Sequence, residues 1–101
     1  MNFLSEAHAL EGEMRAFFED LHRHPEPSHF ENRTNQRVRE QLRAHQIDML
    51  CPKDNITIAV IRGAKPGKTV GLRFDTDALQ MQELCDVPYK SETDGLMHGC
   101  G

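Results

Sequence analysis

The sequence lacks any apolar run approaching the ~20 residues that a membrane-spanning helix requires. Its first residues, MNFLSEAHALEGE, show neither the basic start nor the apolar stretch of a signal peptide. Positive charge is also scarce: 12 Lys and Arg stand against 16 Asp and Glu, for a net charge of −4, and no basic stripe carries interleaved aromatic residues. We therefore expect neither a membrane nor a nucleic acid as a partner.

Cysteine is sparse. Cys51, Cys85 and Cys100 cannot all pair within one chain, and no two of them form a Cys-x-x-Cys motif. This usage is typical of reduced thiols, so the sequence predicts a cytoplasmic location.

The remaining composition is that of a folded protein. The chain has 101 residues, 38% of them hydrophobic and 28% charged. A chain of this length can bury about 65% of its unfolded surface, enough for one small domain. We find no internal boundary and predict a single domain over residues 1–101.

The N-terminal third predicts two helices. An apolar stripe at three- and four-residue steps indicates an amphipathic helix that ends before Pro25, and core packing is the favoured role of the stripe; its members are Leu4, Ala7, Leu10, Met14, Phe17, Phe18 and Leu21. Ser28 and Glu31 have capping-box spacing, so a second helix should start near His29. No glycine marks the end of that helix near His45 and Gln46, which leaves its C-cap open.

Two histidines, His22 and His24, lie in the short polar segment between these helices. In a loop they could bind a metal ion, but surface or turn positions are favoured.

Two strands follow. Residues 55–62 are apolar on nearly both faces, which is typical of a buried strand. Residues 63–68 predict a turn through their glycines and proline, and Val70, Leu72 and Phe74 alternate with other residues in a second, antiparallel strand. The predicted class is α/β, with two N-terminal helices packed on a small sheet that contains a β-hairpin. Its open edges would allow self-association.

Asp75 and Asp77 follow the second strand two residues apart, so both side chains should point to the same side. Ligand sites in open α/β sheets lie at the carboxyl ends of strands. The two acids could bind a hard metal ion or orient the ligands of another metal. Hydrogen bonding to loop amides is an equally good alternative.

A second candidate is the segment Met97-His98-Gly99-Cys100-Gly101. Imidazole and thiolate are ligands that zinc and similar ions prefer, and glycine lets the backbone approach a metal closely. An unremarkable thiol is the alternative for Cys100.

Taken in order, five short segments resemble the N-terminal part of the M20 metallopeptidase-like amidohydrolases, the branch that contains hippurate hydrolase, aminoacylase-like enzymes and indole-acetyl-amino-acid hydrolases. The resemblance runs from about Phe18 onward. The segments are Leu21-His22 with Pro25-Glu26, Phe30-Glu31 with Thr34, residues 59–67, residues 72–79 with Glu83, and residues 97–101. Gln80 and Pro27 depart from the family pattern, which usually has proline and leucine there.

The resemblance implies hydrolysis of an N-acyl amino acid or small peptide by two divalent metal ions, with zinc, manganese or cobalt as candidates. It makes Cys100 a metal ligand. His98, Asp75 and Asp77 would support the loop or orient ligands, with Asp77 the better candidate of the two acids.

The resemblance also implies that the chain is an incomplete, N-terminal part of a zinc-peptidase-like catalytic domain. The general-base glutamate, the other ligands and the dimerisation domain would all lie beyond Gly101. We therefore expect no catalytic residue here and no activity from the isolated chain. The alternative is a stand-alone small α/β protein that binds a partner or self-associates.

Overall fold

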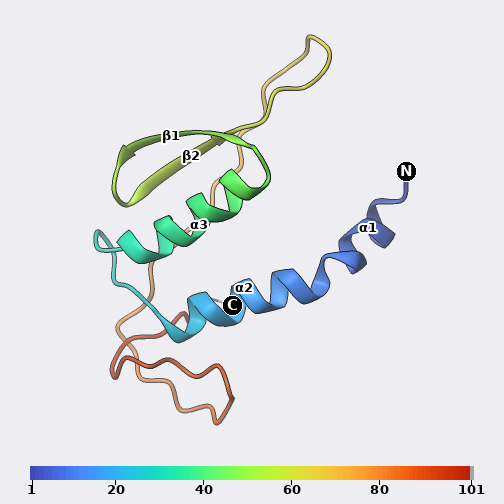
Figure 1. Cartoon of the computed structure of the whole chain (residues 1–101). Coiled ribbons are helices and arrows are strands. Elements are labelled where there is room, and N and C mark those ends of the chain that lie inside the picture. Colours follow the sequence, from blue (N-terminus) through green and yellow to red (C-terminus); the bar gives the residue numbers. More distant parts are fainter. Residues whose placement is uncertain (101) are drawn as a thin grey trace. The chain divides into compact units, whose positions relative to one another are not determined.

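The computed structural model describes residues 1–100, and they form two compact units. One unit combines residues 1–25 with the residues from Leu79 onward, and the other is Glu26–Ala78. The elements follow in the order α1 (Phe3–Ala9), α2 (Glu11–Arg23), α3 (Asn32–Ala44), β1 (Asp48–Lys53) and β2 (Ile56–Val60) (Figure 1). The predicted α/β class is confirmed, while the contact expected between the first helix and the sheet stays a prediction.

The first predicted helix is divided. α1 ends and α2 begins around Leu10, and α2 ends at Arg23 with His24 as its C-cap, just before Pro25 as expected. Core packing of the apolar stripe is wrong for the described residues, because Leu4, Met14 and Phe18 are all exposed. The contact of α1 with α2 is the main contact between described elements on this stretch, and it leaves most of the stripe open.

The start of α3 agrees with the prediction, but its cap does not. The helix begins at Asn32, close to the expected His29. Ser28 is exposed and is not the N-cap; the carboxylate of Glu26 instead accepts hydrogen bonds from the first-turn amides of Arg33 and Thr34. Glu26 lies before the Ser28–Glu31 pair in the sequence. The capping-box pattern considers only that pair, so it could not predict Glu26 as the acceptor.

α3 ends in a Schellman motif without glycine. The Gln46 N–H donates to the Arg43 carbonyl and the Ile47 N–H donates to the Leu42 carbonyl. Gln46 adopts the left-handed conformation, at φ 56°, that glycine usually supplies. The C-terminus of α3, which the sequence left open, is therefore closed by Gln46 in a strained conformation.

The hairpin contains only one of the two predicted strands. β1 pairs antiparallel with β2 across a turn at Asp54-Asn55, with an irregularity in register between Leu50 and Lys53. β2 lies within the strand predicted at 55–62, whereas the described residues 61–77 contain no strand. The sequence hides β1 because Pro52 lies within it and its residues do not alternate.

Residues 61–77 leave the hairpin as a long loop (Figure 1). Val70, Leu72 and Phe74 are 77–80% exposed, so the predicted alternation exists without a burying partner. A strand needs a neighbouring chain to accept its backbone hydrogen bonds, and no other described segment pairs with this one.

α3 packs against both strands. The Arg39 guanidinium donates from Nη2 to the carbonyls of Lys53, Asp54 and Ile56 and from Nε to the Thr57 hydroxyl. The Thr57 hydroxyl in turn donates to Asn35, which is buried in α3. The joint between helix and hairpin is therefore polar.

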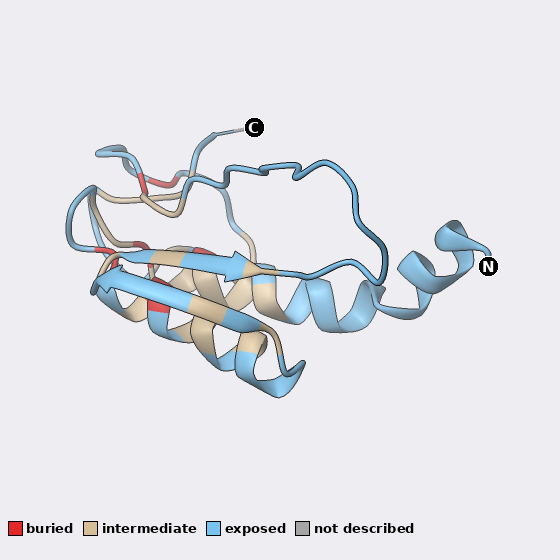
Figure 2. Cartoon of the chain, turned by 90° about the horizontal axis from the view of Figure 1, so that it is seen from above, coloured by how far each residue is buried: buried red, intermediate tan, exposed pale blue. Residues whose placement is uncertain are grey.

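The outer face of the hairpin is open. Leu50, Ile56 and Ile58 are exposed. Figure 2 shows both strands in the colours of exposed and intermediate residues, so the expectation of a strand buried on both faces is wrong for the described chain. Among the helices of residues 1–100, none has the length and apolar character needed to cross a bilayer.

Candidate functional site

The segment Met97–Cys100 is held by backbone pairing. Leu79 and Met97 form an antiparallel bridge in which each N–H donates to the carbonyl of the other, at 2.9 and 3.0 Å. Beyond the bridge, a Cβ added at Gly99 would lie 2.6 Å from the sulfur of Met81. Glycine at this position therefore lets the chain run close to Met81 before it reaches Cys100.

A buried histidine–carboxylate pair lies in the same unit. Nε2 of His22, in the last turn of α2, lies 3.0 and 2.9 Å from the two carboxylate oxygens of Glu83. The residues are only 7% and 3% exposed. Glu83 Oε1 also accepts the backbone N–H of Ser91 at 2.6 Å. The pair thus joins α2 to two separate parts of the C-terminal loop.

Aromatic rings surround His22. Its ring stacks on Phe18 and meets Tyr89 edge to face, with ring centroids 5.8 and 5.6 Å apart. The ring of His98 lies tilted to it at a centroid distance of 6.4 Å. His98, which the sequence singles out, is thereby brought beside His22, which the sequence places in a polar linker.

The surroundings of Glu83 favour its ionised form. The Ser91 N–H and then the His22 side chain lower the pKa of this carboxyl below its ordinary value, against the opposing effect of burial. An ionised carboxylate can only accept hydrogen bonds, so Nε2 of His22 carries the proton that both oxygens share. The sequence favoured a surface or turn position for His22, and this prediction is wrong because the side chain is buried.

His24 differs from His22. It is half-buried, and its Nε2 lies 3.2 Å from a carboxylate oxygen of Glu92, while its Nδ1 approaches Asp20. His24 thus lies at the end of α2 between a carboxylate of its own helix and one of the C-terminal loop, in agreement with the expected turn position.

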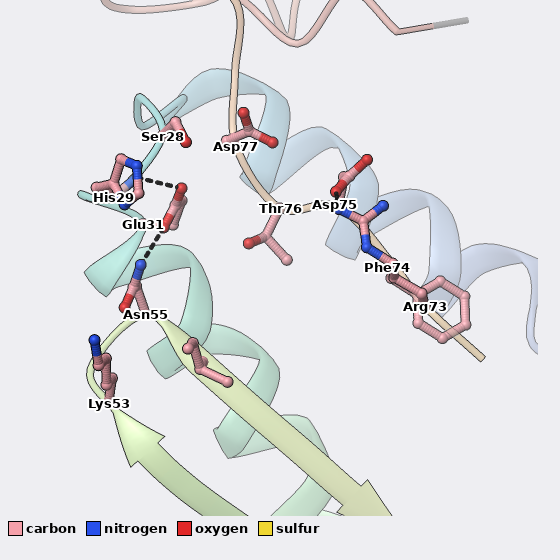
Figure 3. A pocket seen from close by; sticks show the side chains of 11 residues that line it. Ser28, His29, Glu31, Lys53, Asn55, Arg73, Phe74, Asp75, Thr76 and Asp77 are labelled. Carbon is pink, nitrogen blue, oxygen red and sulfur yellow. Dashed lines mark hydrogen bonds and ion pairs between the residues drawn. The ribbon is translucent and has the colours of Figure 1, made fainter. Parts of the chain in front are cut away.

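The two aspartates behave separately. Asp75 is exposed and pairs with the Arg73 guanidinium at 2.7 Å, while Asp77 is half-buried. Both line an open hollow of about 550 Å³ in the unit Glu26–Ala78 (Figure 3). Glu31 lies in the same hollow, where its carboxylate accepts hydrogen bonds from the His29 backbone and the Asn55 amide.

The predicted site residues fall in different units. Asp75 and Asp77 belong to Glu26–Ala78, whereas His98 and Cys100 belong to the other unit, so their expected proximity stays a prediction. Cys100 is an exposed free thiol, as are Cys51 and Cys85. Within residues 1–100, no three His, Cys, Asp or Glu side chains are grouped so that they could hold a metal ion.

Sequence reasoning missed the pairing of Glu83 with His22. The partners are 61 positions apart, and no periodic pattern connects residues at that separation. The resemblance does include both positions, so it contained the only signal available.

Comparison with known proteins bears on the class of the chain. A search of family models finds no match. The chain is 42% identical over 84 residues to N-acetylcysteine deacetylase of Bacillus subtilis, a match that covers 81% of this chain and 22% of that protein. It is 43% identical over 83 residues to thermostable carboxypeptidase 2 of Saccharolobus solfataricus, covering 80% and 21%. Hippurate hydrolase of Campylobacter jejuni is 32% identical over 103 residues, covering 100% and 27%.

A solved structure agrees. A Bacillus subtilis protein described as a dinuclear metal-binding peptidase of the M20 family superimposes with a TM-score of 0.86 at 38% identity, over 92% of this chain and 26% of that one. The relatives are named as a deacetylase, a carboxypeptidase and a hydrolase, and the solved structure is described as a peptidase. More narrowly, the chain belongs to the M20 peptidase family, as its motifs predict. It spans between about a fifth and a quarter of the length of these curated relatives.

Proposed function

We propose that this chain forms part of the catalytic domain of a metal-dependent amidohydrolase that cleaves N-acyl amino acids or small peptides. The observation that carries the proposal is the similarity to three hydrolases whose names all indicate cleavage of an amide bond. The free thiols of the three cysteines support a reducing, cytoplasmic setting. Both compact units would belong to the one domain.

Two divalent ions, with zinc, manganese or cobalt as candidates, are the proposed cofactors. The exposed thiol of Cys100 is a donor that fits such an ion, and it lies on a segment fixed by the Leu79–Met97 bridge. Asp77, Asp75 and His98 would support that ligand. When bound, divalent ions polarise the scissile carbonyl and lower the pKa of a bound water.

The isolated chain should be inactive. Zinc sites draw on at least three protein ligands, and the described residues provide no such group. Hydrolysis also needs a general base within reach of the attacking water. The buried Glu83 is occupied by His22 and Ser91, so it does not serve as that base. We propose that the base and the remaining ligands come from the length by which the relatives exceed this chain.

One observation favours a second candidate function, self-association as a small α/β protein. Val70, Leu72 and Phe74 are at least 77% exposed, and the two-stranded sheet has open edges. Sedimentation of the 101-residue chain tests this candidate. A stable dimer that dissociates on Leu72→Thr would support it, and a monomer would remove it.

The principal experiment compares two proteins. One is the 101-residue chain, and the other is a chimera in which this chain replaces the matching residues of the Bacillus subtilis deacetylase. N-acetylcysteine and hippurate are offered with added zinc, manganese or cobalt. Turnover by the chimera alone is the expected result. Turnover by the isolated chain would contradict the proposal, and so would a folded chimera that turns over neither substrate with any metal.

A further inference from the structure

We propose that His22 and Glu83 are positioning residues: their buried pair fixes the Met97–Cys100 segment and so presents the Cys100 thiol. The function of the thiol rests on the proposed metal site, whereas its placement rests on contacts within one unit. Neither residue is a candidate ligand, because each is occupied by the other.

The first link runs from α2 to Glu83. Both carboxylate oxygens lie within 3.0 Å of Nε2 of His22, so the orientation of the carboxylate is defined by the helix. Stacking of Phe18 and the edge contact of Tyr89 restrict the imidazole ring in turn. His22 belongs to α2 and its ring is fixed by these contacts. The position of α2 therefore determines where the Glu83 carboxylate lies.

The second link runs from Glu83 to Met97. Glu83 accepts the Ser91 N–H at 2.6 Å, and the Ser91 hydroxyl donates to the Leu96 carbonyl at 2.7 Å. Leu96 precedes Met97, whose backbone pairs with Leu79. One chain of hydrogen bonds therefore connects α2 with the segment that carries His98 and Cys100.

Neither regular secondary structure nor an apolar core orders this loop. Residues 79–100 contain no helix and no strand, and Ala78 is the sole buried hydrophobic residue of the described chain. Other hydrogen bonds secure the middle of the loop, among them those from Gly95 N–H to the Gln82 side chain and from Glu92 N–H to the Arg23 carbonyl. Because apolar packing is scarce, loss of the buried pair should loosen the loop locally.

Amide hydrogen exchange of the 101-residue chain tests the placement. In Glu83→Ala, exchange at Leu79 and Met97 should accelerate about tenfold or more, since a buried partner of two donors is lost. Amides of the β1–β2 ladder lie in the other unit and should keep their rates. Unchanged rates at Leu79 and Met97 in the folded variant would overturn the proposal.

A conservative variant separates positioning from general stability. The amide oxygen of Glu83→Gln can still accept the Ser91 N–H, so this variant should restore most of the protection at Met97. If Glu83→Ala fails to fold, the exchange rates of Glu83→Gln test the proposal instead. In that variant, a moderate acceleration confined to the amides of Leu79 and Met97 would support the proposal. An equal acceleration of amide exchange in both units would overturn it.

Cobalt absorption of the chimera gives a readout specific to the thiol. The thiolate-to-cobalt band should be present in the parent chimera, weaker in Glu83→Ala and largely restored in Glu83→Gln. A band unaffected by Glu83→Ala would overturn the positioning of Cys100. A parent chimera without any band would contradict the proposed metal site instead, and the exchange data would then still decide the placement of the loop.

Discussion

The carboxylate of Glu26 accepts hydrogen bonds from both the backbone N–H and the hydroxyl of Thr34, at 2.5 and 2.7 Å. The same carboxylate accepts the Arg33 N–H at 3.1 Å. These donors lie in the first turn of α3, where backbone amides have no partner within the helix and the helix dipole favours negative charge. Glu26 therefore stabilises the N-terminus of α3.

Replacement of Glu26 by alanine should lower the free energy of unfolding by roughly 2 kcal/mol, the scale of hydrogen bonds to a charged acceptor. Ser28→Ala is the matched control. Ser28 is exposed and is not the N-cap, so its loss should change the free energy by less than about 0.5 kcal/mol. Urea unfolding followed by circular dichroism measures both. A larger loss of unfolding free energy in Ser28→Ala than in Glu26→Ala would instead support the predicted capping box.

Gln46→Gly should stabilise the protein by about 0.5–1 kcal/mol, because glycine adopts the left-handed conformation of this position without steric strain. The control is Gln36→Gly, an exposed position within α3, where glycine should cost about 1 kcal/mol. Thermal unfolding of the two variants should move in opposite directions. Destabilisation by both would refute the strain at Gln46.

Arg39→Lys should destabilise the unit Glu26–Ala78 by about 1–3 kcal/mol. A lysine ammonium cannot reproduce the fork that reaches three carbonyls and the Thr57 hydroxyl. Arg43→Lys, an exposed change on the same helix, should be nearly neutral. Equal urea midpoints for the two variants would show that the fork contributes nothing.

Stability should fall in acid, partly through Glu83. The native pKa of this carboxyl is lowered, mainly by the Ser91 N–H and next by His22. Its contribution is therefore fully present above the ordinary carboxyl pKa and is lost as pH falls through the lower native pKa. The difference in unfolding free energy between the parent chain and Glu83→Gln should shrink across that interval. A difference independent of pH would contradict the assignment of charge to Glu83.

Local rules predicted what is local in this fold. Apolar spacing predicted the helical stretch that α1 and α2 divide, the Ser28–Glu31 spacing predicted a helix start close to that of α3, and the apolar run at 55–62 predicted β2. Alternation at Val70, Leu72 and Phe74 predicted a strand that the described chain does not pair. Alternation of apolar residues shows which face of a strand could be buried. A strand also needs a neighbouring strand for its backbone hydrogen bonds, and tertiary contacts determine whether one is present.

The role of Cys100 as a metal ligand was predicted only through the resemblance. Cys100 and His98 carry a recognisable ligand chemistry, yet nothing in their neighbourhood points to His22 or Glu83. Long-range pairs such as these arise from the path of the loop between residues 79 and 97, which periodicity does not describe. Asp75 and Asp77 were predicted to point to the same side because they would follow one strand. The described residues 61–77 contain no strand, so that argument does not apply to them.

The metal content and turnover of the chimera test the central claim most directly. Cys100→Ser removes the proposed thiolate ligand, and Cys85→Ser is the matched control at another exposed free cysteine. The account predicts that Cys85→Ser keeps both metal and hydrolysis of N-acetylcysteine, while Cys100→Ser loses metal and at least about tenfold in turnover. Full metal content and unchanged turnover in Cys100→Ser would contradict it.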